Sequence, residues 1–311
     1  MIFEPQVYYQ AFPADYHKFK VITLKKILED LDKYELEFFD RKLDKDQSKK
    51  FELTLRSEIR QAYFHCSETL FELINALCPE SDGTTHELNI LPRLTNAKTT
   101  AAYDRASDIV NSESGLVFLD KIHNNIDYPV TIGHFLFFYG IAHILPADER
   151  LIIDRSLKSI KILIKNIAKT LSDREEYNSY KHGLRLIPSV KEFGIYSKDL
   201  QESIKFDLSK SVSYYSKTKN PDEVIIKTKV QDTERDIEMT MLCSRLISNI
   251  IECRRFKFCS DTLYDSGQTM IYQFDEKTVE NANKSRVQAQ DIVFSQKLIR
   301  QTIDNNNKNQ L

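Results

Sequence analysis

Two long stretches of the sequence repeat apolar residues at intervals of four and three, and this restricts the fold more than any other feature. The first stretch carries Ile59, Tyr63, Cys66, Leu70, Leu73 and Leu77. The second carries Ile153, Leu157, Ile160, Ile164, Ile167 and Leu171. Residues at this spacing share one face of an α-helix. We therefore predict core helices over about 46–77 and 148–171, packed against each other.

The pattern changes after Pro188. The segments IKFDLSKSVSYYSKTK and EVIIKTKVQDTE alternate polar and apolar residues and are rich in β-branched side chains, with the turn signal NPD between them. Helical spacing returns with Met239, Leu242, Leu246 and Ile250. The predicted fold is therefore mainly α: an antiparallel bundle of long helices with a small antiparallel β meander inserted before a late core helix.

The chain contains only 7 Gly and 8 Pro, so long helices have few breaks. We predict a single helical domain over residues 1–311, with the β insertion at about 192–233. Further helices are expected over 24–43 and, with a polar pattern, over 278–303. The asparagine-rich end, 304–311, is expected to be a disordered tail.

Charge and cysteine usage exclude several classes of protein. The formal net charge is -2, from 44 basic and 46 acidic residues, so nucleic acid or anionic lipid could be held only by a local patch. The most apolar window, 132–145, is too short to span a bilayer, and we expect no membrane association. Five cysteines without a CxxC pair argue against a disulfide framework and favour a cytoplasmic location.

The common motifs for nucleotide, zinc and acyl-transfer chemistry are absent from the sequence, including GxxxxGK[ST], GxGxxG, HExxH and GxSxG. We therefore expect neither a metal nor a cofactor. His134 and His143, which lie in the apolar window, are expected to be core residues with satisfied ring nitrogens.

The first candidate site is RQAYFH, Arg60 to His65, inside the predicted helix 46–77. A guanidinium can stabilise a phosphate transition state while an imidazole transfers a proton, which suits metal-independent RNA cleavage. However, residues five apart lie about 140° apart around a straight helix. The alternative is that His65 is held beside the core by the carboxylates that align with it on the helix, Glu58, Glu68 and Glu72.

The second candidate site is a polar stripe on a short helix that precedes the meander. Its members are Arg174, Asn178, Lys181, His182 and Arg185. Spacings of three and four residues would place their donors on one helix face, where they could bind a phosphate. The alternative is that Gly183 ends the helix, which leaves Lys181 and His182 as cations that favour the helix dipole.

The segments RQAYFHCSETLFELINAL and NSYKHG resemble the HEPN group of helical-bundle proteins, over about residues 25–185 and the helix after the meander. That family carries an R-x4-6-H motif, and its dimers join two motifs in one ribonuclease site, often in toxin and antiviral systems. The resemblance implies that Arg60 and His65 form the motif pair, with Arg174 and His182 as a second pair separated by seven residues.

The resemblance leads us to expect a cytoplasmic protein that binds or cleaves RNA as a homodimer. It also implies a role in a toxin or antiviral defence system. His65 or His182 would act as general acid or base, and Arg60, Lys181 or Arg185 would stabilise phosphate charge. The alternative is a non-catalytic helical module that binds a protein partner or regulates one. Under that alternative, the polar stripe is a docking surface or a helix cap.

Overall fold

The structure is a computed structural model that describes residues 5–123, 130–139, 141, 145–182, 186–188, 192–197, 202–208, 210–217, 223–259, 270–287 and 291–297. The chain divides into two compact units, where the sequence was expected to form one domain. The helical unit comprises Met1–Tyr177 and Asp232–Arg286, and the β unit comprises Asn178–Gln231 and Val287–Leu311. Among the described residues, no helix has both the length and the apolar character needed to cross a bilayer.

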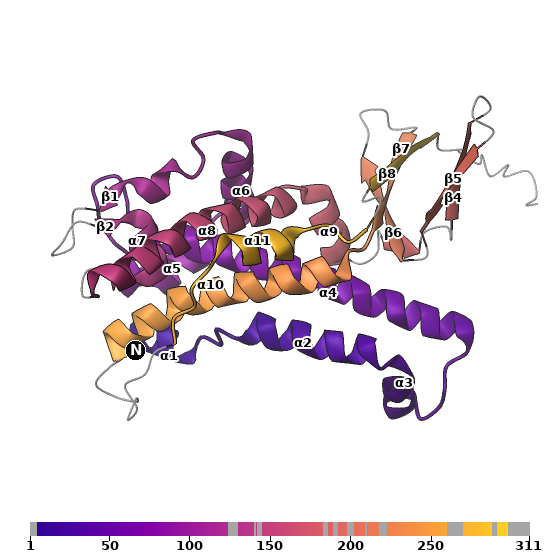
Figure 1. The fold of residues 1–311 in the computed structure, drawn as a ribbon, viewed down its shortest axis with the longest axis horizontal. Coiled ribbons are helices and arrows are strands. Elements are labelled where there is room, and N and C mark those ends of the chain that lie inside the picture. Colours follow the sequence, from indigo (N-terminus) through magenta and orange to yellow (C-terminus); the bar gives the residue numbers. More distant parts are fainter. Residues whose placement is uncertain are drawn as a thin grey trace, which may run out of the picture. The chain divides into compact units, whose positions relative to one another are not determined.

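The helical unit confirms the mainly α prediction (Figure 1). Its helices are α1 (Pro5–Ala11), α2 (Tyr16–Glu29), α3 (Leu31–Phe39), α4 (Lys45–Leu77), α5 (Ile90–Thr95), α6 (Ala101–Asn111), α7 (Ile132–Phe138), α8 (Ala147–Leu171), α10 (Thr233–Cys259) and α11 (Glu276–Asn283). Two 3-10 turns, η1 (Glu87–Asn89) and η2 (Val117–Asp120), and the paired strands β1 (Ile122–His123) and β2 (Val130–Thr131) complete it. The helix α9 (Arg174–His182) begins in the helical unit and ends in the β unit.

The predicted core helices 46–77 and 148–171 form close to their predicted bounds, as α4 and α8. The helix α4 begins after Asp44, whose carboxylate accepts hydrogen bonds from the backbone N–H groups of Asp46 and Gln47, at 2.9 Å each. Acidic residues in the first turn of α8, after Pro146, favour the positive end of that helix dipole. As predicted, α8 packs against α4, and it also packs against α6. The repeated apolar faces of α4 and α8 are buried.

Helices α2, α4 and α10 lie side by side and form much of the core. Arg56 contacts Thr233, and farther along both helices the Cys66 thiol contacts the carbonyl of Thr240, so α4 and α10 run in the same direction. In contrast, α2 runs antiparallel to α4, because His17 contacts Thr69 and Lys20 contacts Glu58.

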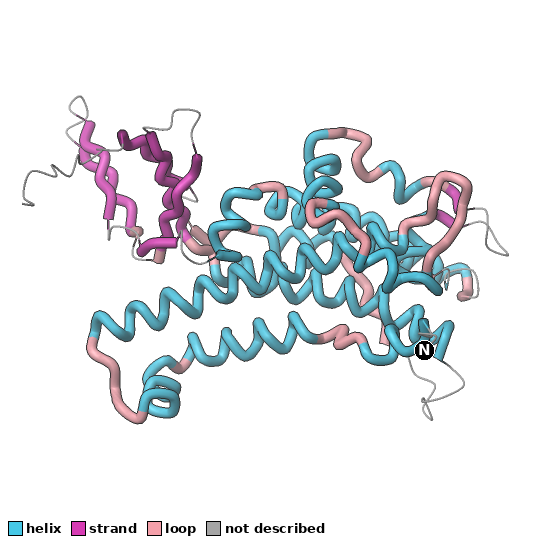
Figure 2. Tube along the Cα trace, turned by 180° about the vertical axis from the view of Figure 1, so that it is seen from behind, coloured by secondary structure: helices cyan, strands magenta, loops and turns pink. Residues whose placement is uncertain are grey.

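The β unit confirms the predicted small antiparallel sheet before a late core helix (Figure 2). Strands outside the predicted range 192–233 also belong to this unit. Its four-stranded sheet has the order β3-β6-β7-β8, and β4 pairs with β5 in a separate two-stranded sheet. The strands are β3 (Leu186–Pro188), β4 (Glu192–Ser197), β5 (Glu202–Asp207), β6 (Ser211–Lys217), β7 (Glu223–Val230) and β8 (Asp291–Lys297).

Two of the helix predictions differ from the structure. The segment 278–303 is not one helix, because α11 ends at Asn283 and the chain then forms β8, which pairs with β7 from Asp291 to Lys297. The segment 24–43 is divided at Asp30, where α2 ends and α3 begins. The predicted tail, 304–311, lies outside the described residues.

Candidate functional site

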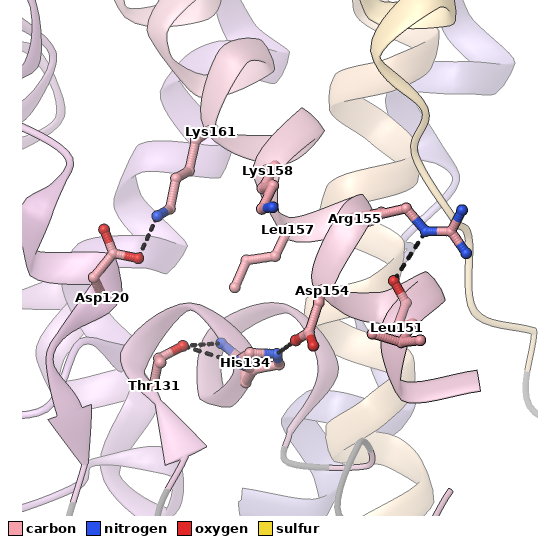
Figure 3. Close-up of a pocket in the computed structure, with 9 residues that line it drawn as sticks. All are labelled: Asp120, Thr131, His134, Leu151, Asp154, Arg155, Leu157, Lys158 and Lys161. Carbon is pink, nitrogen blue, oxygen red and sulfur yellow. Dashed lines mark hydrogen bonds and ion pairs between the residues drawn. The ribbon is translucent and has the colours of Figure 1, made fainter. Parts of the chain in front are cut away.

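A pocket of about 590 Å³ opens in the helical unit between α8 and the segment that contains η2, β2 and α7 (Figure 3). This volume is in the range of pockets that bind small molecules. The lining residues are Asp120, Thr131, His134, Leu151, Asp154, Arg155, Leu157, Lys158 and Lys161. We call it the His134 pocket, because the imidazole of His134 is the one ring among the described residues of the lining.

A chain of hydrogen bonds fixes the imidazole of His134. Thr131 caps the N-terminus of α7 and its hydroxyl oxygen accepts from the backbone N–H of His134, at 3.3 Å. The same hydroxyl lies 2.8 Å from Nδ1 of His134, and Nε2 lies 2.9 Å from a carboxylate oxygen of Asp154 (Figure 3). In the neutral ring, the hydroxyl therefore donates to Nδ1 and Nε2–H donates to Asp154. This geometry matches that of a general base held by an orienting carboxylate.

The close approach of α7 to α8 depends on Gly133. A Cβ atom at this position would lie 2.9 Å from a methyl carbon of Leu157 and 3.2 Å from the carbonyl oxygen of Leu119. The absent side chain thus lets the start of α7 lie directly against α8. That contact brings His134 within hydrogen-bonding distance of Asp154, which is 20 residues away in the sequence.

Among the described residues that line the pocket, positive charge exceeds negative charge. They include three cations, Arg155, Lys158 and Lys161, and two carboxylates, Asp120 and Asp154. Lys161 is paired with Asp120, while Lys158 is exposed to solvent. An oriented imidazole beside cations can move a proton and stabilise an anion in one place.

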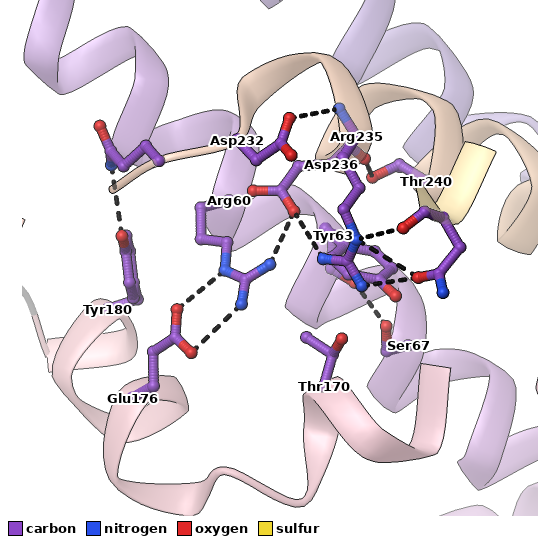
Figure 4. A network of polar contacts seen from close by, with 12 residues as sticks. Arg60, Tyr63, Ser67, Thr170, Glu176, Tyr180, Asp232, Arg235, Asp236 and Thr240 are labelled. Carbon is purple, nitrogen blue, oxygen red and sulfur yellow. Dashed lines mark hydrogen bonds and ion pairs between the residues drawn. The ribbon is translucent and has the colours of Figure 1, made fainter. Parts of the chain in front are cut away.

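The structure places Arg60 in a buried ion-pair network (Figure 4). Its Nε and one terminal nitrogen donate to the two carboxylate oxygens of Glu176, at 2.9 and 3.1 Å, and the other terminal nitrogen donates to Asp236, at 2.6 Å. The ring of Phe64 lies 4.7 Å from the guanidinium carbon. Burial raises the pKa of Asp236, although Arg60 and Arg235 oppose this effect. Arg60 thus holds α4, α9 and α10 together.

His65 lies near α2, whereas the partners of Arg60 are on α9 and α10. It is half-buried on α4, and it is close enough to His17 on α2 to influence the titration of that residue. Glu68, one of the carboxylates expected beside His65, accepts a hydrogen bond from the hydroxyl of Tyr177 at 2.5 Å. Arg60 therefore contacts α9 and α10, whereas His65 lies near His17 of α2, in agreement with their separation around α4.

The contact between α2 and α4 makes the stability of the fold sensitive to acid. His17 is buried, and desolvation, followed by the positive potential of His65 and Lys20, lowers its pKa to about 4. The unfolded chain therefore binds this proton at a higher pH than the folded chain. The free energy of unfolding falls as the pH falls from about 6.5 towards 4, by about 1.4 kcal/mol per pH unit.

We expect His17→Gln to make the free energy of unfolding less dependent on pH in this range. Urea unfolding of both proteins between pH 7 and pH 5 measures it, and equal slopes would contradict the assignment.

The members of the predicted polar stripe lie on α9 as far as the structure describes them. Arg174 is exposed in its first turn, with the guanidinium carbon 5.3 Å from the ring of Tyr103. Asn178 and the exposed Lys181 follow in the β unit, and His182 is the last residue of the helix. Gly183 and Arg185 lie outside the described residues, as does His143.

The His134 pocket was not predicted from the sequence. The prediction that both ring nitrogens of His134 are satisfied is confirmed, but the residue lines a pocket and is not enclosed in the core. The spacing T-x-x-H before a helix was the available local signal, because it places a histidine where a capping box has an acidic residue or glutamine. Nothing in the sequence indicates that Asp154 is the second partner.

Within the described part of the chain, no three His, Cys, Asp or Glu side chains are grouped so that they could hold a metal ion. In comparisons with known proteins, no family model, no curated protein and no solved structure matches this chain.

Proposed function

We propose that the protein binds single-stranded RNA and cleaves it by acid–base chemistry at the His134 pocket, without a catalytic metal. The observation that carries the proposal is an imidazole held by Thr131 and Asp154 in a cation-lined pocket of about 590 Å³. Such a volume suits a nucleotide, and an unpaired base can enter a pocket that a base pair cannot.

The roles follow from the chemistry of the lining. His134 accepts a proton from the attacking hydroxyl or returns one to the leaving oxygen, and Asp154 stabilises the imidazolium that forms. In the neutral ring Nδ1 is the nitrogen that can accept a proton, and the hydroxyl of Thr131 occupies it, so a substrate hydroxyl reaches Nδ1 by displacing Thr131. Lys158 and Arg155 stabilise the charge on the phosphate. Leu151, which is 59% exposed, offers an apolar surface to a base.

The site in this proposal differs from the one that the HEPN resemblance implies. Arg60 is buried with two carboxylates, and a phosphate would have to displace both before it could reach the guanidinium. At the His134 pocket only the hydroxyl of Thr131, which is not fully buried, has to be displaced. The proposed chemistry is the same as the one expected from the sequence, but His134 replaces His65 and His182 as the proton-transfer group.

The experiment is an RNA cleavage assay with purified protein in EDTA, using a single-stranded oligonucleotide labelled at one end. We expect cleavage by the natural chain and cleavage at least about 100-fold slower by His134→Gln purified in the same way. Failure of the natural chain to cleave RNA, or equal cleavage by His134→Gln, would overturn the proposal.

A second candidate function is protein binding, with a second copy of this chain as the partner. It is favoured by a groove of about 610 Å³ between the start of α2 and the end of α10. Two aromatic residues that line it, Tyr16 and Phe19, are 54% and 62% exposed. Exposed aromatic side chains in a groove are frequent at protein interfaces.

If this groove joins two copies, Phe19→Ser is expected to shift the protein from dimer to monomer without changing its stability, because the ring is exposed. Leu88→Ser is the matched control, since Leu88 is also 62% exposed and does not line the groove. Sedimentation velocity of the three proteins measures the effect. A monomeric natural chain, or equal dimerisation of all three, would exclude a dimer through this groove.

A further inference from the structure

The helix α8 carries a row of cations that is not balanced by acidic residues. From Arg155 to Leu171 the sequence is RSLKSIKILIKNIAKTL, which contains five basic residues and no Asp or Glu. We call these residues, Arg155, Lys158, Lys161, Lys165 and Lys169, the basic stripe. In a chain with a net charge of -2, this is a local concentration of positive charge.

The helical geometry places the basic stripe along one side of α8. At 3.6 residues per turn, Lys158, Lys165 and Lys169 lie within about 40° of one another around the axis and extend for about 17 Å along it. All three are exposed. Within the described part of the chain none of them is paired with a carboxylate, whereas Lys161 is paired with Asp120. The exposed cations are therefore available to an anion from solution.

Helix stability alone does not account for the basic stripe. The helix dipole favours a cation in the last turn, which explains Lys169 but not Lys158 or Lys165. The charged residues of α4 show the usual alternative, because there the exposed Lys50 is paired with Asp46, at 3.0 Å, and the half-buried Arg56 is paired with Glu52, at 2.7 Å. On α8 the carboxylates that would complete such pairs are missing after Asp154.

The basic stripe is continuous with the His134 pocket, because Arg155 and Lys158 belong to both. We propose that it holds the sugar-phosphate backbone of single-stranded RNA and leads the strand into that pocket, an inference that rests on the proposed function. A narrow row of cations matches a linear polyanion. A helix that binds a membrane would also expose bulky apolar side chains, and α8 exposes none from Arg155 onward.

The test measures binding separately from cleavage. The probe is a fluorescent single-stranded oligonucleotide of 2′-O-methyl RNA, which cannot be cleaved through its 2′-hydroxyl, and anisotropy is followed at several salt concentrations. The stripe variant is Lys165→Gln/Lys169→Gln, which leaves the lining of the pocket intact. The matched control is Lys49→Gln/Lys50→Gln, which removes two exposed lysines from α4 and gives the same net charge.

We expect the stripe variant to bind about 10- to 100-fold more weakly at 50 mM salt and to lower the slope of log K against log[salt] by about 1.4, since each single-strand contact contributes about 0.7. The control should bind like the natural chain. Equal affinities of the two variants would overturn the inference even if the natural chain cleaves RNA. If the stripe variant loses RNA binding and the control variant does not, the inference is supported even if no RNA is cleaved. Binding to phosphatidylserine vesicles but not to RNA would also overturn it.

Discussion

His134→Gln is expected to slow RNA cleavage by about 100- to 10,000-fold, which is the usual contribution of a general acid or base. Glutamine keeps a polar side chain that can contact Thr131 or Asp154, but it cannot take up and release a proton near neutral pH. The measurement is the rate constant for cleavage of saturating single-stranded RNA in EDTA. Binding of uncleavable RNA should change little, because the cations of the pocket and of the basic stripe remain.

The matched control is His86→Gln. The side chain of His86 is 19% exposed and contacts a carboxylate of Glu80, whereas that of His134 is 15% exposed and contacts Asp154. The two substitutions therefore remove similar rings with similar partners, and only one of these rings lines the pocket. If both variants lose activity equally, or if His134→Gln loses activity only because it unfolds, the assignment of His134 is wrong.

Arg60→Met is expected to lower the free energy of unfolding by about 3–5 kcal/mol, because it removes the guanidinium that pairs with two buried carboxylates and leaves Asp236 only its longer contact with Arg235, at 3.8 Å. Glu176 and Asp236 are 0% and 2% exposed, so water cannot replace the guanidinium unless the local structure opens. Methionine keeps much of the apolar volume of the arginine side chain, which limits the cavity. Urea unfolding at neutral pH measures the change.

Lys50→Met is the matched control on the same helix. Lys50 pairs with Asp46 in an exposed i,i+4 contact, and its loss should cost less than about 0.5 kcal/mol. Arg60→Lys should be intermediate in stability, since a lysine keeps the charge but cannot form the paired contacts with Glu176. An Arg60→Met protein of natural stability that no longer cleaves RNA would contradict this account, because it would give Arg60 the role that the HEPN resemblance implies.

The elements that were predicted correctly are those whose sequence pattern involves only residues close together in the chain. The apolar residues of α4 and α8 recur at helical spacing over about five turns, and no pairing with a distant segment is needed to form them. The strand β8 was missed because its conformation depends on pairing with β7, which lies about 70 residues earlier in the chain. Its own strand signal, Ile292, Val293 and Phe294, covers only three residues within a polar stretch, and pairing in the sheet decides its structure.

The candidate site was harder to predict than the fold for the same reason. Arg60 and His65 were grouped because they are close in sequence, but the partners of Arg60 are 116 and 176 residues away. The His134 pocket likewise depends on two helices and on Gly133, which permits their close approach. The basic stripe was visible in the sequence, since residues 155–171 lack any acidic residue, but an unpaired row of lysines is recognised only when the neighbouring helices are known.

The central claim is that RNA enters the His134 pocket. It is tested most directly by NMR of protein labelled at its 7 histidines, titrated with single-stranded 2′-O-methyl RNA, with His134 assigned by its absence from the spectrum of His134→Gln. We expect the imidazole resonance of His134 to shift until the RNA saturates the protein, with the same dissociation constant as that measured by anisotropy. An unchanged His134 resonance in protein saturated with RNA would contradict it.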